Sequence, residues 1–318
     1  MALTLPEAAK LSTTHLQRGV IETFVQESAI LDRIPFMNIE GNAYAYNAEG
    51  TLPGVEFRAV NGAYSESTGT VNQSTESLVI LGGDADVDRF IQKTRSDLND
   101  QRAVQTALKV KAASYKFQNS FFNGDVATEP LGFDGLKKRL IGAQVLDADT
   151  DGAPVLGVNG AAAHDFFDML DALIAQVPGL TGANGAIYAN AQIAGKIRSA
   201  GRRIGGTEIV REDLTGKRVL QYNGIAILDP ADDSAGNLIL PQTETMGSSL
   251  DTSSIYAVKF GQDEGDRGVT GLTNGGVQVD DLGELQEKPS YRTRIEFYTG
   301  LALFGGKAAA RLRGIKNA

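Results

Sequence analysis

Two adjoining segments decide the fold of this chain: LNDQRAVQTALKVKAASYKFQNS (residues 98–120) and FFNGDVATEPLGFDGL (residues 121–136). The first keeps helical spacing and predicts a helix over 97–123, which at 1.5 Å per residue is about 35–40 Å long. The second holds an aromatic pair, an Asn-Gly turn and further glycines, so the chain turns away from the helix end. Neither segment has a pattern of catalytic side chains, and we interpret the helix as the spine of a subunit.

The spine helix is expected to present two different faces. An apolar stripe that should face the core is formed by Val104, Ala107, Leu108, Tyr115 and Phe122. Arg102, Lys109 and Lys116 repeat every seven residues on another face. We expect the apolar stripe to hold the subunit together, the basic face to be available to another copy, and the turn after Phe122 to be a hinge.

Composition excludes several classes of protein. The 318 residues are 42% hydrophobic and 22% charged, which is ordinary for a globular protein, and the net charge of −9 is not that of a nucleic-acid binder. There is no cysteine, so neither a disulfide framework nor a thiolate metal site is available. The N-terminal residues lack the pattern of a signal peptide, and no apolar run is long enough to span a membrane. The 37 glycines, many of them in Asn-Gly or Asp-Gly turns, favour an α+β chain with much antiparallel strand.

Two segments precede the spine helix. Residues 2–36 form a polar arm with one amphipathic helix that Pro35 ends. The apolar residues of that helix are Leu16, Val20, Ile21 and Phe24. In residues 37–82, NAYAYNAEG (42–50) and VEFRAV (55–60) predict two strands around a Leu-Pro-Gly turn, followed by a Ser/Thr/Asn-rich stretch and the strand LVIL (78–81). This extended loop has too few apolar residues for a core, so it must lie on its own body or on a neighbour.

Residues 155–262 predict a compact α/β sub-domain. AAHDFFDMLDALIAQV (162–177) is a helix with Phe166, Leu170, Leu173 and Val177 facing inward, and Asn190 is placed to cap a second helix that carries Ile193 and Ile197. The predicted strands are AIYAN (186–190), VLQYNGIAILDP (219–230), NLIL (237–240) and SSIYAVKFG (253–261).

The last part of the chain returns to antiparallel strands. In YRTRIEFYTG (291–300) Tyr291, Ile295 and Phe297 alternate with Arg292, Arg294 and Glu296, which indicates a half-buried strand. LALF (301–304) and ARLRGI (310–315) follow across a Gly-Gly pair.

Possible catalytic and metal sites are weak. His15 and His164 have no second ligand at metal spacing, and no serine has a plausible base. DADTDG (147–152) copies half of a calcium loop, but Val158 stands where the bidentate acid is needed, so an acidic turn competes with a weak cation site. Residues 300–307 resemble a phosphate loop without its Ser/Thr, and a strand-to-strand turn is the better interpretation. The acids of the 162–177 helix, Asp165, Asp168 and Asp171, are expected to be solvated.

A charge contrast links the extended loop and the spine helix. The loop is rich in glutamate, whereas residues 93–118 are rich in lysine and arginine. We hypothesise that these charges meet between copies; the alternative is two solvated surfaces. The contact residues of the hypothesis are Glu49, Glu56, Arg58 and Glu66 of the loop and Arg102, Lys109 and Lys116 of a neighbour's helix.

The order of these parts resembles the major capsid proteins of tailed phages, of the Hong Kong 97 type. The resemblance covers nearly the whole chain and rests on NIEGNAYAYNAEGTLPGVEFRAVN, LGGDADVDRFI, FFNGDVATEPLGFDGL, AIYANAQIAGKI, GIAILDP, SSIYAVKFG and YRTRIEFYTGLALFGGKAAARLRGI. It implies an α+β fold with five parts: an N-terminal arm (1–36), an extended β-hairpin loop (37–84), a peripheral domain with the spine helix (85–150), an α/β axial domain (151–265), and closing peripheral strands with the C-terminus (266–318).

The resemblance implies a structural subunit without catalytic residues, cofactors or metals. Such a subunit assembles with itself into hexamers and pentamers of an icosahedral shell around double-stranded DNA, in the host cytoplasm, and becomes part of the virion. A portal, a separate scaffold protein and an optional decoration protein are the expected partners. Some family members cross-link through a lysine of the extended loop, but this chain has no lysine from 11 to 92. The short segment before the loop favours a separate scaffold and an uncleaved arm.

Three alternatives remain open on the sequence alone. A bacterial encapsulin-type nanocompartment shell has the same fold and encloses protein cargo, so it predicts a docking groove near the arm. An α/β hydrolase predicts a concave pocket with perturbed acids. A fibre protein predicts elongated trimers.

Overall fold

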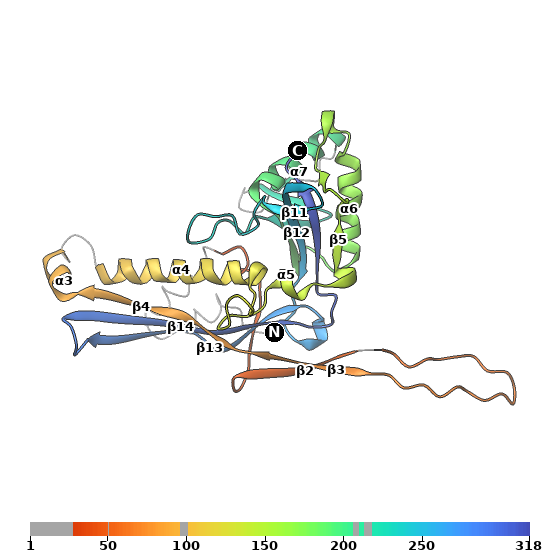
Figure 1. Cartoon of the computed structure of the whole chain (residues 1–318). Coiled ribbons are helices and arrows are strands. Elements are labelled where there is room, and N and C mark those ends of the chain that lie inside the picture. The colour runs from red at the N-terminus through yellow and green to blue at the C-terminus, as the bar shows by residue number, and fades with distance from the viewer. Residues whose placement is uncertain (1–27, 50, 96–100, 206–209, 213–217) are drawn as a thin grey trace.

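The computed structural model describes the chain except for residues 1–27, 50, 96–100, 206–209 and 213–217. Figure 1 shows three parts: a long helix lying along a sheet, a second sheet with two helices standing at an angle to it, and a narrow hairpin projecting away from both. The predicted arm helix at Leu16–Phe24 and the residue His15 lie outside the described residues.

The peripheral sheet has the strand order β1-β13-β14-β4, with β1 parallel to β13 and the other pairs antiparallel. Its strands are β1 (Phe36–Asn38), β4 (Val79–Asp88), β13 (Val269–Glu284) and β14 (Ser290–Leu303). The predicted alternation along β14 is confirmed, because Ile295 and Phe297 are buried on the face that meets the helix. Residues 301–303 of LALF are the end of this same strand and not a separate one.

The opposite face of the peripheral sheet carries a ladder of ion pairs between β4 and β14. Arg292 Nε donates to Asp86 Oδ1 at 2.7 Å, and Arg294 Nε donates to Asp84 Oδ1 at 2.8 Å. Lys288 adds a second cation to Asp86 at 2.7 Å. Hydrogen bonds from Arg292 and Lys288 hold the pKa of Asp86 well below its ordinary value, and those from Arg294 do the same for Asp84.

This ladder predicts an acid-labile contribution to stability. Since the folded-state pKa of Asp86 is depressed, its contribution is present above the ordinary aspartate pKa of about 4 and is lost as the pH falls below that value. In Arg292→Gln the free energy of unfolding, measured with urea at pH 7 and at pH 3, should therefore decrease less between the two pH values than in the unchanged protein. An equal decrease in the free energy of unfolding in both proteins would show that the pair makes no measurable contribution to stability.

The spine helix is present as α4 (Gln101–Asn123). Phe122 of the predicted stripe is fully buried, but the rest of the buried face differs from that stripe. Val104 and Leu108 are 42% and 56% exposed, whereas Val110, Phe117 and Phe121 are almost fully buried. The prediction failed because small polar residues, Thr106 and Ser114, occupy buried positions on the face that meets the sheet. The apolar pattern alone therefore indicated the wrong face.

A short helix, α3 (Arg89–Arg95), follows β4 and precedes α4 in the chain.

Aromatic rings of α4 join the peripheral sheet to the rest of the subunit. Phe117 contacts the rings of Phe36, Phe133 and Phe297, with centroid distances of 5.9 to 6.2 Å. One turn later, Phe122 packs against Tyr188 and Tyr256 of the second sheet, at 5.4 and 5.1 Å. A single core therefore runs from the peripheral sheet through α4 into the second sheet.

The expected hinge after Phe122 is instead a closely packed joint. Gly135 N donates to Gly124 O at 2.9 Å, so the two glycines lie side by side. A Cβ atom on Gly124 would lie 2.3 Å from the Phe133 carbonyl oxygen, and one on Gly135 would lie 2.5 Å from that of Ser120. Only glycine permits this approach, and it leads into the short helix α5 (Leu136–Arg139).

The axial sheet has the strand order β5-β15-β12-β7-β10-β9-β8, with β11 paired to β12 and β6 to β15. Its strands are β5 (Val145–Asp147), β6 (Ala153–Pro154), β7 (Gly185–Tyr188), β8 (Val210–Glu212), β9 (Arg218–Tyr222), β10 (Ile225–Leu228), β11 (Glu244–Met246), β12 (Ser249–Lys259) and β15 (Ala309–Lys316). Single 3-10 turns lie at Gly142–Gln144, Val158–Gly160 and Glu264–Asp266.

Two helices, α6 (Ala163–Ala175) and α7 (Ala191–Ile204), pack with the axial sheet. The predicted inward residues of α6 are confirmed, since Phe166, Leu170 and Leu173 are fully buried. The predicted cap of α7 is also confirmed, because Asn190 Oδ1 accepts the backbone N–H of Ile193 at 2.8 Å. The predicted strand at 237–240 is wrong: this segment makes a single bridge, and β11 takes the place beside β12.

The hairpin consists of β2 (Ala43–Glu49) and β3 (Val71–Ser77), paired in the register Ala43↔Ser77 to Glu49↔Val71. The predicted strand at 55–60 is wrong, since the polar segment 71–77 takes its place beside β2. Residues 51–70 form a long loop beyond the strands, which we call the loop tip. The Leu-Pro-Gly step lies within this tip and does not close the hairpin.

Among the described residues, no helix has the length and apolarity needed to cross a membrane.

Candidate assembly surface

The loop tip exposes large apolar side chains. Val55 and Phe57 are 95% and 109% exposed, and Leu52, Val60 and Tyr64 are also mostly exposed. The tip projects beyond the two sheets (Figure 1), so within the described part of the chain these side chains have no core to pack on. An apolar group of this kind on an extended segment is typical of a surface that another chain covers.

The backbone of the loop tip is held in shape by polar contacts. Thr70 N donates to Thr51 O at 2.9 Å, and the Ser67 hydroxyl donates to Gly54 O at 2.9 Å. Glu56 accepts the backbone N–H of Ser65, and this bond holds the pKa of Glu56 below its ordinary value. The polar groups therefore order the loop while the apolar groups face outward.

The loop residues of the charge hypothesis bind groups within the tip or lie near it. Arg58 Nη1 lies 3.3 Å from Gly62 O, and its guanidinium carbon lies 5.3 Å from the ring centre of Tyr64. Glu66 is exposed, and Glu49 ends strand β2.

The helix residues of the hypothesis are not brought to the loop within one chain. Arg102 Nη2 donates to Asp281 Oδ1 at 2.6 Å, and Lys116 Nζ donates to Glu129 Oε2 at 2.7 Å. The side chain of Lys109 lies along β4 over Gly83.

The sequence prediction missed the apolar tip because it assigns Val55, Phe57 and Val60 to a strand. The signal that was available is the apolar character of these residues beside a polar segment.

The other candidate residues have structural partners. Asp147 pairs with Arg313, and Asp151 Oδ1 accepts the backbone N–H of Ser248 at 2.8 Å. Asp171 Oδ1 accepts the Tyr222 hydroxyl at 2.8 Å. His164, Asp165 and Asp168 are exposed on α6. Residues 300–307 are the end of β14 and the turn that follows it. Within the described part of the chain there is no group of three or more metal-ligating side chains.

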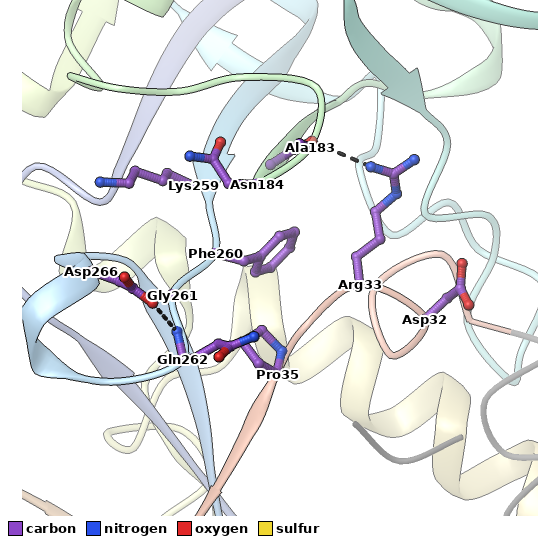
Figure 2. Close-up of a pocket in the computed structure, with 11 residues that line it drawn as sticks. Asp32, Arg33, Pro35, Ala183, Asn184, Lys259, Phe260, Gly261, Gln262 and Asp266 are labelled. Atoms are coloured by element: carbon purple, nitrogen blue, oxygen red, sulfur yellow. Dashed lines mark hydrogen bonds between the residues drawn. The ribbon is translucent and has the colours of Figure 1, made fainter. Parts of the chain in front are cut away.

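An open cavity of about 510 Å³ lies where the segment before β1 meets the axial sheet (Figure 2). Arg33 Nη1 donates to Gly185 O at 3.3 Å across it, and Lys259, Phe260 and Asp266 line the other side. Among the described residues that line the cavity there is no serine, cysteine or histidine.

Comparison with known proteins gives one family match and several structural ones. Residues 13–155 match the model of the family described as major capsid protein GP7. No curated protein sequence matches the chain.

The solved structures extend the likeness to the whole chain. The holo-SrpI encapsulin complex from Synechococcus elongatus PCC 7942 is 17% identical, with a TM-score of 0.63 over 90% of this chain and 86% of that chain. The capsid of a native GTA particle is 16% identical, with a TM-score of 0.61 over 92% and 90%. A structure from Mycobacterium phage Bobi is 13% identical, with a TM-score of 0.60 over 100% of both chains. The resemblance to tailed-phage major capsid proteins and the predicted α+β fold are confirmed.

Proposed function

We propose that this chain, a major capsid protein of the Hong Kong 97 type, assembles with itself into the hexamers and pentamers of an icosahedral shell that encloses double-stranded DNA. The five-part division of the chain at residues 36, 84, 150 and 265 belongs to this proposal, with β5 and β15 as strands that cross these boundaries to join the axial sheet. So do a host-cytoplasmic site of assembly, a portal, a separate scaffold protein, a possible decoration protein and weak non-specific contact with the DNA. We assign the chain no catalytic residue and no cofactor.

The observation that carries the proposal is the loop tip. In a subunit that stayed alone, five large apolar side chains would remain in water on a projecting hairpin. Covering one such side chain contributes about 1.5–3 kcal/mol. We therefore infer that the tip of one copy lies on an adjacent copy, and that this contact is a main source of the assembly energy.

Expression of the full chain and negative-stain electron microscopy test the proposal. We expect closed shells of uniform size when the proposed scaffold protein is co-expressed. Elongated trimers, or a persistent monomer at high concentration with that scaffold present, would contradict the proposal.

Charge pairing between copies is a second part of the proposal. Glu49, Glu56, Arg58 and Glu66 of the loop would meet Arg102, Lys109 and Lys116 of a neighbour. Exposed pairs contribute only about 0–1 kcal/mol each, so they would fix the register of the contact more than its strength. Arg102 and Lys116 already form ion pairs inside the subunit, so Lys109 gives the cleaner test.

Lys109→Glu should slow or misdirect assembly at low ionic strength, because it places a negative charge opposite the acidic loop. Light scattering during assembly, at low and high salt, measures the effect, and high salt should reduce it by screening. Lys307→Glu, an equal charge change in the turn after β14, serves as the control. Normal particles from Lys109→Glu at low salt would show that the pairing is wrong.

The cavity in Figure 2 favours one alternative, a nanocompartment shell that encloses protein cargo, because it forms a recess beside the end of the arm, at Asp32, Arg33 and Pro35. The two functions differ in what the particle contains. Purified particles from the native source should hold double-stranded DNA under our proposal, whereas a co-purified cargo protein without DNA would favour the nanocompartment.

A further inference from the structure

One short helix, α5, carries three consecutive basic residues that bind acids in three different parts of the subunit. One acid lies on β11 of the axial sheet, one in the loop after the spine helix, and one on β3 of the hairpin. The three pairs are Lys137–Glu244, Lys138–Asp125 and Arg139–Glu76. The helix itself is fixed between the parts, because Leu136 is fully buried and Leu140 nearly so.

The pair between Arg139 and Glu76 is bidentate and mostly buried. The two side chains are 16% and 17% exposed, and Arg139 Nη2 donates to Glu76 Oε2 at 2.7 Å. Arg139 Nε also donates to the Asp134 carbonyl oxygen at 2.6 Å, which holds the guanidinium in position. A two-point bond of this kind fixes direction as well as distance.

The pair between Lys137 and Glu244 connects α5 to the axial sheet. Lys137 Nζ lies 3.1 Å from Glu244 Oε1, and Arg311 Nη2 donates to the same oxygen at 2.9 Å. Burial opposes the ionisation of Glu244, but Arg311, Ser254 and Lys137 together hold its pKa below the ordinary value. Glu244 is therefore a firm anchor in the axial sheet.

The base of the hairpin is also attached through a small buried apolar cluster that includes Tyr46, Leu272 and Phe304. β3 leads into β4 through the single residue Leu78. The Tyr46 ring lies 4.9 Å from that of Phe304, and the Tyr44 hydroxyl donates to Glu264 at 2.6 Å. These contacts hold the hairpin to the end of β14 and to the turn at 264–266, whereas the Glu76–Arg139 pair is its connection to α5.

We propose that α5 couples the axial sheet to the hairpin, so that the Arg139–Glu76 pair sets the direction in which the loop tip leaves the subunit. The consequence for shell geometry rests on the proposed function, but the coupling is a property of one subunit. A shell of hexamers and pentamers places the same chain in different surroundings, and the angle of the loop decides which neighbour geometry it reaches.

Distance measurement between two spin labels tests the coupling directly. The chain has no cysteine, so Ala63→Cys in the loop tip and Ala172→Cys on α6, both at exposed positions, provide two specific sites. Labelled full-length chains are diluted into unlabelled ones so that only distances within one subunit are recorded, whether or not shells form. In this background, Arg139→Gln should broaden and shift the distance distribution.

Two further variants control for general loosening. Lys138→Gln removes the exposed pair on the same helix, whose side chains are 52% and 35% exposed, and should leave the distribution unchanged. The double variant Glu76→Arg with Arg139→Glu exchanges the two charges and restores an ion pair. It should narrow the distance distribution again. If Arg139→Gln impairs folding, Glu76→Gln breaks the same pair and leaves the Arg139 bond to Asp134 in place.

An unchanged distribution in Arg139→Gln and Glu76→Gln would overturn the coupling, as would equal broadening in Lys138→Gln. Failure of the unchanged chain to form shells would instead overturn the proposed function, while the distance distributions would still report on the coupling.

Discussion

Replacing Val55, Phe57 and Val60 together by serine should stop shell assembly and leave the subunit folded. These side chains are almost fully exposed in the single chain, so they contribute little to its own stability. If a neighbour covers them, the loss of even about 2.8 kcal/mol per contact raises the subunit concentration needed for assembly by about 100-fold. Sedimentation velocity across a concentration series measures this shift, and thermal unfolding of the free subunit checks the fold.

The matched control is Ala59→Ser with Ala63→Ser, which adds serines to the same loop without removing large apolar groups. This variant should assemble like the unchanged chain. Assembly of the triple variant at the ordinary concentration would show that the loop tip is not a major contact.

Phe117→Ala should be the most destabilising single change in the spine helix. The ring is fully buried and packs on rings from β1, β14 and the loop after the spine helix. Its removal leaves a cavity at the centre of the shared core, with an expected loss of about 3–5 kcal/mol in the free energy of unfolding. Urea unfolding of the free subunit measures the loss, and folded subunits should be scarce at physiological temperature.

Leu108→Ala on the same helix is the control, because Leu108 is 56% exposed. It should change the free energy of unfolding by less than about 0.5 kcal/mol. A large loss of unfolding free energy in Leu108→Ala, together with a small loss in Phe117→Ala, would contradict the observed packing. It would support the buried stripe predicted from the sequence instead.

The sequence was sufficient where one periodicity dominates a segment. In α6 the apolar residues at helical spacing are the buried ones, and in β14 the strict alternation of Ile295 and Phe297 with Arg292 and Arg294 gives the buried face. The cap at Asn190 followed from local chemistry alone. Each of these features depends on residues close together in the chain.

The sequence was insufficient where partners are distant. The buried face of α4 depends on how closely the helix approaches a sheet, which lets Thr106 and Ser114 be buried while Leu108 is exposed. The partner of β2 is a polar segment, so hydrophobicity gave no sign of it. The acids that bind α5, at 76, 125 and 244, are separated by long stretches of sequence and only the fold brings them together.

The site was predicted in part. The composition of the extended loop predicts a segment without a core, as an interface requires, whereas the contact residues predicted from the sequence are its charged ones. Its polar groups turned out to order the loop, as Ser65 and Glu56 do, while the apolar groups are the exposed ones.

Cryo-electron microscopy of the particles formed by the full chain tests the central claim most directly. The account predicts a closed icosahedral shell in which the loop tip of each subunit lies on an adjacent subunit, with the side chain of Phe57 buried at that contact. A particle in which residues 51–70 remain in solvent, or fold back onto their own subunit, would contradict it.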